Sequence, residues 1–496
     1  MDRTESSPPR VSRLSKSRFI AGLQCYRQLW WRVHEPEAPE LVPDETQQAI
    51  FDQGSRVGAV ARTYVPGGTL IDAPYYEHAR RLEQTHQALR AGAPVIYEAA
   101  FEADGVFVAV DILERHGDAF HLIEVKSSTK VKDEHVPDAA VQLHVLRQAG
   151  LEVPRVEVMH LNRACRYPRL DNLFTRVDVT REAEAWLRHV GPEIESQLRM
   201  LARPLPVVAI GRHCNVPYTC PFKNRCWVNV PQHHVRELYR IGARANEFVE
   251  AGYITIDQIP KSIRLKGITE RQRRAVREGR RIIERGLRKA MGSLGPPLMH
   301  LDFETIMPAI PVWDGCRPYD AIPVQFSLHR IESDGSLRHV AWLAEGGADP
   351  RPACAQQLIA ACAGTGPIVA YNAPFERDCI RALAEALPQH ARELRRIEAR
   401  LVDALPWVRD YIYDPEFHGG FGLKQVLPVL VPGLDYSDLE ISDGETASLE
   451  LHRLLLEPEG VSAEERSRLR RTLLAYCERD TLATVRLVER LRELAE

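Results

Sequence analysis

The segment VFVAVDILERHGDAFHLIEVKSS constrains the fold most, because it holds two apolar runs around a turn at Gly117. Runs of β-branched and other apolar residues on either side of a turn predict a β-hairpin. The first strand is expected to end at Asp111, and the second carries Glu124 and Lys126. Residues two apart on a strand share a face. Glu124 and Lys126 should therefore project together, with Asp111 beside them.

These three side chains form a set that can hold a divalent metal ion. Asp111 and Glu124 offer the oxygen ligands that Mg²⁺ and Mn²⁺ prefer. Such an ion can activate water and stabilise charge on a phosphate. Lys126 can neutralise the phosphorus centre or help to deprotonate the water. A helix expected over Asp138 to Gln148 adds Gln142. The alternative is a surface ion pair without a chemical role.

A second set of acids follows in the C-terminal part of the chain. Asp302 and Glu304 are two apart on a strand-like run, and Tyr476 and Asp480 are four apart on a helix, so each pair shares a face. Without a metal ion, a cluster of these acids would be mutually repulsive, which favours a bound divalent cation. The candidate members are Asp302, Glu304, Glu376, Asp403, Tyr476 and Asp480.

Three of the ten cysteines lie in one polar loop, CNVPYTCPFKNRC, as Cys214, Cys220 and Cys226. In a reducing compartment such cysteines indicate metal ligands rather than disulfides. Their spacing is loose for a zinc knuckle, whereas iron–sulfur clusters tolerate varied spacing and a remote fourth ligand such as Cys25. Zinc, completed by His213, is the alternative. The scattered cysteines elsewhere are interpreted as core residues.

The order strand-Asp, strand-Glu-x-Lys, helix-Gln resembles the PD-(D/E)xK nucleases, specifically their RecB-like branch. The chain departs from that pattern at two positions, where Leu146 replaces a tyrosine and Gly58 stands where relatives carry a histidine. Relatives of the CRISPR-associated and AddB type place one cysteine before the nuclease core and three after it. The resemblance implies a 4Fe–4S cluster held by Cys25, Cys214, Cys220 and Cys226.

The C-terminal motifs D-x-E, N-x-x-F-(D/E) and Y-x-x-x-D resemble the DEDD exonucleases of the DnaQ or RNase D type, which have an RNase H-like fold. The resemblance implies that Tyr476 orients the attacking water and that Asp403 is a supporting acid. Glu376 stands where relatives have aspartate. The implied ligands of two metal ions are Asp302, Glu304, Glu376 and Asp480.

The length of 496 residues predicts two or three domains. The net charge of −3 excludes a uniformly basic nucleic-acid binder, so any such role must come from local patches or bound metals. No secretory signal is expected in Met1 to Arg18. The uncharged stretch from Pro352 to Phe375 is interpreted as a helix, a turn and a strand rather than a membrane span. A cytoplasmic protein is predicted.

Residues 236–292 are expected to form a basic helical linker, with twelve Lys or Arg and three Glu between Lys261 and Ala290. The favoured interpretation is a solvated basic face, and the alternative is contact with a nucleic-acid backbone. Within it, IGARANEFVEAGYITIDQIP predicts two short helices around Gly252. This arrangement weakly resembles a helix-hairpin-helix.

Together these patterns predict an α/β chain with a restriction-endonuclease-like domain (residues 1–235), the linker, and an RNase H-like domain with a mixed sheet (residues 293–496). Phrases such as LIEVKSSTKVKDEH and LLAYCERDTLA resemble a bacterial family of uncharacterised proteins that fuses these two domains. The implied function is Mg²⁺- or Mn²⁺-dependent cleavage of nucleic acid, with DNA as the expected substrate and a role in repair or defence. The alternatives are a cluster-stabilised nucleic-acid-binding protein and, less favoured, an iron–sulfur electron carrier.

Overall fold

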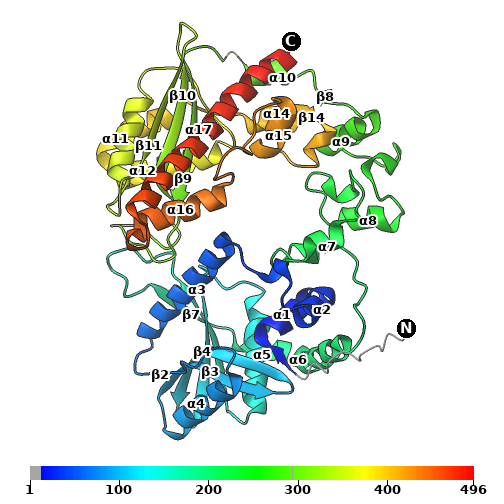
Figure 1. Ribbon diagram of the computed structural model, residues 1–496, viewed down its shortest axis with the longest axis vertical. Coiled ribbons are helices and arrows are strands. Elements are labelled where there is room, and N and C mark those ends of the chain that lie inside the picture. Colours follow the sequence, from blue (N-terminus) through cyan, green and yellow to red (C-terminus); the bar gives the residue numbers. More distant parts are fainter. Residues whose placement is uncertain (1–12, 293) are drawn as a thin grey trace. The chain divides into compact units, whose positions relative to one another are not determined.

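The computed structural model describes residues 13–292 and 294–496, and it shows a mixed α/β chain with several sheets (Figure 1). Residues 1–12, part of the stretch expected to lack a secretory signal, lie outside the described residues. The chain divides into two compact units. Unit 1 runs to Val228 and includes the short segments 309–312 and 316–319, and unit 2 comprises residues 229–308, 313–315 and 320–496.

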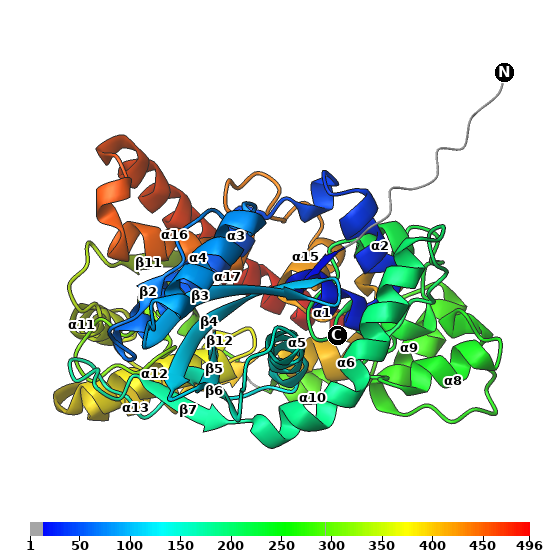
Figure 2. The same cartoon turned by 90° about the horizontal axis from the view of Figure 1, so that it is seen from below.

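Unit 1 is built on a seven-stranded sheet in the order β2-β3-β4-β5-β6-β7, with β1 paired to β4. Helix α5 packs on β3, β4 and β6, while α3 packs on β5, so both faces of the sheet are covered (Figure 2). The strands are β1 (Leu14–Ser15), β2 (Thr69–Leu70), β3 (Val95–Ala103), β4 (Val106–His116), β5 (Ala119–Lys126), β6 (Arg155–Leu161) and β7 (Phe174–Asp178). The helices are α1 (Lys16–Gln24), α2 (Tyr26–His34), α3 (Glu45–Thr63), α4 (His78–Arg90), α5 (His135–Gln148), α6 (Thr180–Leu201) and α7 (Lys223–Trp227).

The predicted hairpin is present as the antiparallel pair β4 and β5. The first strand does not end at Asp111, however, but continues to His116, because Ile112 pairs with Ile123 in the core. Val110 packs in the core beside α5, whereas Ile112 packs in the core beside α3. The alternation of the strand therefore breaks at Asp111.

The helical stretch from Lys16 to His34 is divided into α1 and α2. Cys25 has an extended backbone (φ −164°, ψ 121°) and separates α1 from α2. No proline or glycine marks this break, so the sequence pattern could not reveal it. The break leaves Cys25 at a helix junction rather than on a continuous helical face.

Unit 2 contains a five-stranded sheet in the order β11-β10-β9-β12-β13, in which β9, β10 and β11 are antiparallel and β12 and β13 are parallel. Its strands are β9 (Leu298–Ile306), β10 (Ile322–Ile331), β11 (Leu337–Leu343), β12 (Ile368–Ala370) and β13 (Leu401–Asp403). The helices around it are α11 (Arg351–Ala361), α12 (Pro374–Ala386), α13 (Ala391–Glu398), α14 (Leu405–Tyr411), α15 (Leu423–Leu430), α16 (Gly444–Leu456) and α17 (Ala463–Leu494).

The two faces of this sheet have different partners. Met299, Leu301 and Phe303 of β9 pack in one core with α11, α12 and α13. The residues between them therefore face the other side, where α16 and α17 contact β9 (Figure 1). As predicted, the uncharged stretch from Pro352 to Phe375 holds a helix and a strand, α11 and β12.

The basic helical segment belongs to unit 2 and has a small core of its own. It contains α8 (Arg244–Glu250), α9 (Gly267–Glu278), β8 (Ile282–Ile283) and α10 (Leu287–Met291), with β8 paired to β14 (Ile412–Tyr413). The interpretation as a solvated basic face is wrong for Arg271 and Arg273, which are buried. Their guanidinium groups donate to backbone carbonyls, among them those of Arg409 and Pro260. These arginines are internal links, because each guanidinium can satisfy several loop carbonyls at once.

In the part of the chain that the structure describes, no helix combines the length and the apolar character needed to cross a lipid bilayer.

Candidate functional site

The acid cluster of unit 2 forms where β9, α12 and α17 meet. Asp302 and Glu304 project from the face of β9 that α17 covers. Ligand atoms of Asp302, Glu304 and Cys477 lie within 4.8 Å of one another. The carboxylates of Glu376 and Asp480 come close enough to both strand acids to perturb their pKa values. The structure thus brings together the four acids that the sequence singled out.

Burial and mutual repulsion dominate the electrostatics of this cluster. Burial, followed by the charges of Asp480, Glu304 and Glu376, raises the pKa of Asp302 well above its ordinary value. Burial and the charge of Asp480 raise the pKa of Glu304 to about 8.

Burial likewise raises the pKa of Glu376 to about 8. Glu376 is only 2% exposed, and its Oε2 has no hydrogen-bond partner among the described residues. A buried carboxylate oxygen without a partner is costly. The donor set therefore fits one or more divalent cations, which would both balance the charge and use that oxygen.

Lys424 and Tyr436, which the sequence did not indicate, hold Tyr476 and Asp480 in place. Lys424 of α15 donates from Nζ to the Tyr476 hydroxyl at 2.8 Å and lies over both the Tyr476 and Tyr436 rings. Tyr436 donates its hydroxyl proton to Asp480 Oδ1 at 2.5 Å. These contacts span 52 and 44 residues of sequence, so no local pattern signals them.

Asp403 ends β13 and is tied to the backbone. Its Oδ1 accepts from the backbone N–H groups of Asn372 and Leu405, both at 3.0 Å. Its charge contributes to the raised pKa of Glu376. This geometry suits a supporting acid that fixes the loop before α12 better than a primary metal ligand. Asp378, two residues after Glu376 on α12, has a side chain that is 78% exposed, so it is not part of the cluster.

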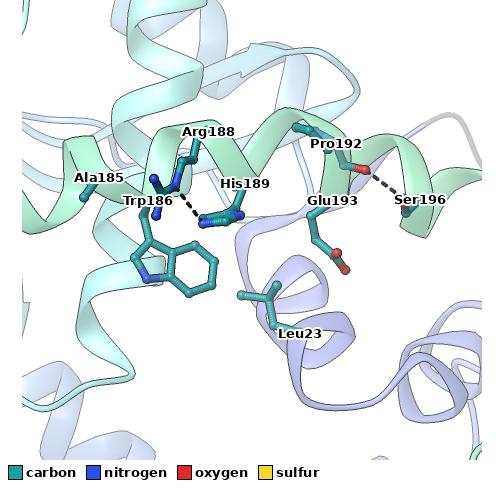
Figure 3. A pocket seen from close by; sticks show the side chains of 8 residues that line it. All are labelled: Leu23, Ala185, Trp186, Arg188, His189, Pro192, Glu193 and Ser196. Carbon is teal, nitrogen blue, oxygen red and sulfur yellow. Dashed lines mark hydrogen bonds between the residues drawn. The ribbon is translucent and has the colours of Figure 1, made fainter.

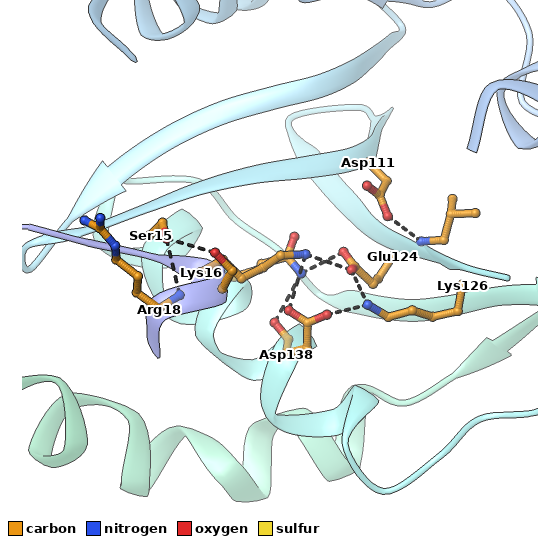
Figure 4. Close-up of polar contacts among 10 residues, drawn as sticks. Ser15, Lys16, Arg18, Asp111, Glu124, Lys126 and Asp138 are labelled. Carbon is orange, nitrogen blue, oxygen red and sulfur yellow. Dashed lines mark hydrogen bonds and ion pairs between the residues drawn. The ribbon is translucent and has the colours of Figure 1, made fainter. Parts of the chain in front are cut away.

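The carboxylate centre of unit 1 is an ion-pair network (Figure 4). Glu124 Oε1 accepts from Lys16 Nζ and from Lys126 Nζ, both at 2.7 Å. Lys126 also donates to Asp138 Oδ2 at 2.5 Å. Asp111 Oδ2 accepts from the backbone N–H of Val125 at 2.7 Å, so the hairpin does bring it beside the second strand.

The remaining oxygen of Glu124 is also engaged, because Gln142 donates from Nε2 to Oε2 at 2.8 Å. Although burial favours the neutral form, the Lys126 and Lys16 ammonium groups hold the pKa of Glu124 well below its ordinary value. Burial and the charge of Glu124 raise the pKa of Asp111 to about 8. Two lysines here face three acids, so this centre is closer to internal charge balance than the cluster of unit 2.

Sequence reasoning missed Lys16 and Asp138 as members of this centre. Lys16 stands 108 residues before Glu124, and only the packing of α1 against the sheet brings it there. The two departures from the nuclease pattern lie outside the network. Leu146 is fully buried in the core, and a side chain at Gly58 on α3 would meet open space.

The four predicted cysteine ligands line one cavity, and so does His213 of the zinc alternative, whose Nε2 lies 3.8 Å from Cys214 Sγ. Burial raises the pKa of Cys220 to about 11, and the charges of the other three thiols add to this effect. In the part of the chain that the structure describes, these thiols belong to no group of three ligand atoms within 4.8 Å of one another. Sulfurs around a single zinc ion lie about 3.8 Å apart. The four cysteines are Cys25, Cys214, Cys220 and Cys226.

A separate hollow lies between α1 and α6, lined by Leu23, Trp186, His189 and Glu193 among others (Figure 3). Arg188 donates from Nε to His189 Nε2 at 3.0 Å at its rim. None of the predicted site residues lines this hollow.

Comparison with known protein families gives a match to one segment of the chain. A family model described as a domain of unknown function (DUF2779) matches residues 299–422. No curated protein matches the chain. The matched segment includes Asp302, Glu304, Glu376 and Asp403, and it ends before Tyr476 and Asp480.

Proposed function

We propose that this chain is a metal-dependent nuclease whose principal centre is the acid cluster of unit 2, acting as a 3′–5′ exonuclease on DNA. One observation carries the proposal. Three segments far apart in sequence place four carboxylates, Asp302, Glu304, Glu376 and Asp480, in one buried site where their charges repel one another. A fold tolerates such a cluster when a cation binds there.

The mixed sheet of unit 2, with α17 over the acid-bearing face of β9, supports assignment to the RNase H-like fold. When bound, Mg²⁺ or Mn²⁺ would activate a water and stabilise charge on the scissile phosphate. Asp302, Glu304, Glu376 and Asp480 would hold the ions. Asp403 fixes the loop that leads to Glu376 by accepting from the Asn372 N–H, while its bond from the Leu405 N–H holds the start of α14.

Tyr476 is the residue we assign to positioning the attacking water. Burial and the charge of Asp480 raise the pKa of the Tyr476 hydroxyl, so it stays protonated and can donate a hydrogen bond. Lys424 donates to the oxygen of that hydroxyl, and the hydroxyl also hydrogen-bonds to the Asp480 carboxylate beside the strand acids. Tyr436 donates its hydroxyl proton to Asp480 Oδ1 and so holds that carboxylate oxygen in place.

A 4Fe–4S cluster in the cysteine cavity is favoured over one zinc ion because, among the described residues, no three of these thiols lie within 4.8 Å of one another. A cluster there would link the α1–α2 junction, through Cys25, to the loop of Cys214, Cys220 and Cys226. Its role would be to hold these segments of unit 1 together.

The test is cleavage by the purified full chain of labelled single-stranded and double-stranded DNA and RNA, with Mn²⁺. Asp302→Asn removes a ligand charge with little change in volume and is expected to abolish the 3′–5′ activity. Asp378→Asn is the matched control, since Asp378 is exposed on α12. A folded, metal-loaded parent that cleaves none of these substrates would overturn the proposal.

One observation favours a second role for unit 1. Glu124 is already paired with Lys16, Lys126 and Gln142, so an ion would have to displace an ammonium group. Unit 1 could therefore bind nucleic acid without cutting it. Salt-dependent DNA binding that survives Glu124→Gln, with no change in cleavage, would support this role.

A further inference from the structure

A His–Glu–His cluster, formed by His233, Glu237 and His418, lies in unit 2 away from the acids described above. His233 precedes the short helix η3 (Val235–Glu237), and His418 directly follows η6 (Pro415–Phe417). Glu237 Oε2 lies 3.9 Å from His233 Nδ1 and 3.8 Å from His418 Nδ1. One ligand atom from each residue lies within 4.8 Å of the other two. The two imidazole rings are stacked with their centroids 5.7 Å apart.

Two of these ligand atoms are buried and unsatisfied. Neither His233 Nδ1 nor Glu237 Oε2 has a hydrogen-bond partner within the described ranges, although both atoms are shielded from solvent. Buried polar atoms in proteins nearly always have a partner. An atom or ion between the two would supply it.

The backbone is held in an unusual conformation at both histidines. His233 has φ of 57° and His418 has φ of 44°, in the left-handed region that few residues other than glycine adopt. Gly419 (φ 82°) follows, and a Cβ there would lie 2.1 Å from the Glu237 carbonyl oxygen. The chain thus approaches Glu237 more closely than any side chain at position 419 permits. Strained backbone of this kind concentrates at ligand-binding sites.

We propose that His233, Glu237 and His418 bind one transition-metal ion of the zinc class, with a further coordination position open to water. Two imidazoles and one carboxylate suit zinc, whereas Mg²⁺ prefers oxygen ligands alone. Bonds of 2.0–2.1 Å around a tetrahedral ion put ligand atoms about 3.4 Å apart. The distances from Glu237 Oε2 to the two Nδ1 atoms, 3.9 and 3.8 Å, need to shorten by about half an ångström. The His418 side chain is 46% exposed, which leaves the ion accessible.

The site would fix the loop that leads into α15. Within that loop, Gly419 donates its N–H to the Tyr413 hydroxyl, and the Phe421 carbonyl accepts from Tyr371. Lys424, which holds Tyr476, follows at the start of α15. The ion would join this loop to the segment around η3. The proposal does not depend on nuclease activity.

A second group of similar composition serves as a contrast. His329, His339 and Glu478 also place ligand atoms within 4.8 Å of one another. There, however, His329 Nδ1 pairs with the Thr481 hydroxyl at 2.8 Å and His339 Nε2 with the Ser327 hydroxyl at 2.9 Å. One ring nitrogen of each histidine already has a hydroxyl partner, so this group is the matched control.

The test is titration of the EDTA-treated full chain with Zn²⁺, in excess Mg²⁺ so that the carboxylate centres are filled. The variant is His233→Asn with His418→Asn, because asparagine also tolerates left-handed backbone and preserves the local fold. The expected result is loss of one zinc equivalent, or affinity at least about tenfold weaker. Co²⁺ bound at this site in the parent should give visible absorption bands. It should give no thiolate charge-transfer band, because the proposed ligands include no cysteine.

The control variant His329→Asn with His339→Asn should keep the zinc equivalent. Equal zinc content and affinity in the parent and the His233/His418 variant would overturn the proposal, as would an equal loss in the control. Glu237→Gln alters neither strained backbone position and is expected to lose the same zinc equivalent. It replaces the double variant in the titration if the double variant fails to fold, and unchanged zinc binding by Glu237→Gln would then overturn the proposal.

Discussion

Lys424 and Tyr476 show how a single contact prepares a side chain for its task. The lysine donates to the tyrosine hydroxyl at 2.8 Å, and the aromatic ring lies beneath the ammonium group. The hydroxyl is thereby oriented between Lys424 and the Asp480 carboxylate. A phenylalanine at the same position would keep the packing and lose only this orientation.

Tyr476→Phe is therefore expected to lower kcat of the 3′–5′ reaction by about tenfold to a hundredfold, as loss of orientation commonly does, with little change in Mn²⁺ affinity. Single-turnover kinetics and Mn²⁺ titration measure the two quantities. Tyr75→Phe, at an exposed tyrosine of unit 1, is the control. An unchanged kcat would remove Tyr476 from the mechanism.

The raised pKa values of the acid cluster predict how stability depends on pH. Glu304 and Glu376 have pKa values of about 8, against an ordinary value of 4.5. The folded state therefore holds protons that the unfolded state releases. Their contribution to stability is full below the ordinary pKa and is lost as pH rises through about 8.

For the metal-free chain we expect Tm to fall as pH rises from about 6 to about 8.5. Mg²⁺ should raise Tm more at the upper end of this range, because protons no longer compete for the carboxylates. Calorimetry with and without EDTA measures both effects. The double variant Glu304→Gln with Glu376→Gln should make the fall of Tm with pH less steep. Part of the fall should remain, because the pKa of the Asp111 carboxyl is also about 8. A Tm that rises over this range would contradict the account.

At the level of helices and strands, the sequence predicted those elements that a pattern of neighbouring residues specifies. The hairpin of β4 and β5 follows from two apolar runs around Gly117, and the acid pair of β9 follows from strand alternation. The break between α1 and α2 at Cys25 has no such signal. The burial of Arg271 and Arg273 was also missed, because charge runs are usually solvated and the carbonyls they satisfy come from distant loops.

The α1–α2 break leads to a prediction about the cysteine cavity. Cys25→Ser should remove the fourth thiol and abolish iron binding, about four irons per chain in the parent. Cys165→Ser is the control, because Cys165 is buried in unit 1 but does not line that cavity. Anaerobic purification with iron and zinc analysis measures the outcome. A parent with one zinc and no iron would contradict the assignment of an iron–sulfur cluster.

At the scale of the whole molecule, the two carboxylate centres differ in charge balance. The centre of unit 1 sets Lys16 and Lys126 against three acids, whereas the cluster of unit 2 sets Lys424 against four. The order of acids along the sequence predicted both centres. It could not reveal this difference, because Lys16 and Lys424 approach from distant segments.

This difference predicts unequal effects of matched substitutions in the full chain. Asp302→Asn should lower cleavage by at least about a hundredfold, and Glu124→Gln should have a much smaller effect. Initial rates on one DNA substrate at fixed Mn²⁺ make the comparison. Equal losses would show that the two centres contribute equally to the same reaction.

The central claim is tested most directly by the products formed from a DNA strand labelled at its 5′ end, with Mn²⁺ and the full chain. The account predicts a ladder of strands shortened one nucleotide at a time from the 3′ end, which disappears in Asp302→Asn and persists in Asp378→Asn. A ladder that persists unchanged in Asp302→Asn would contradict it.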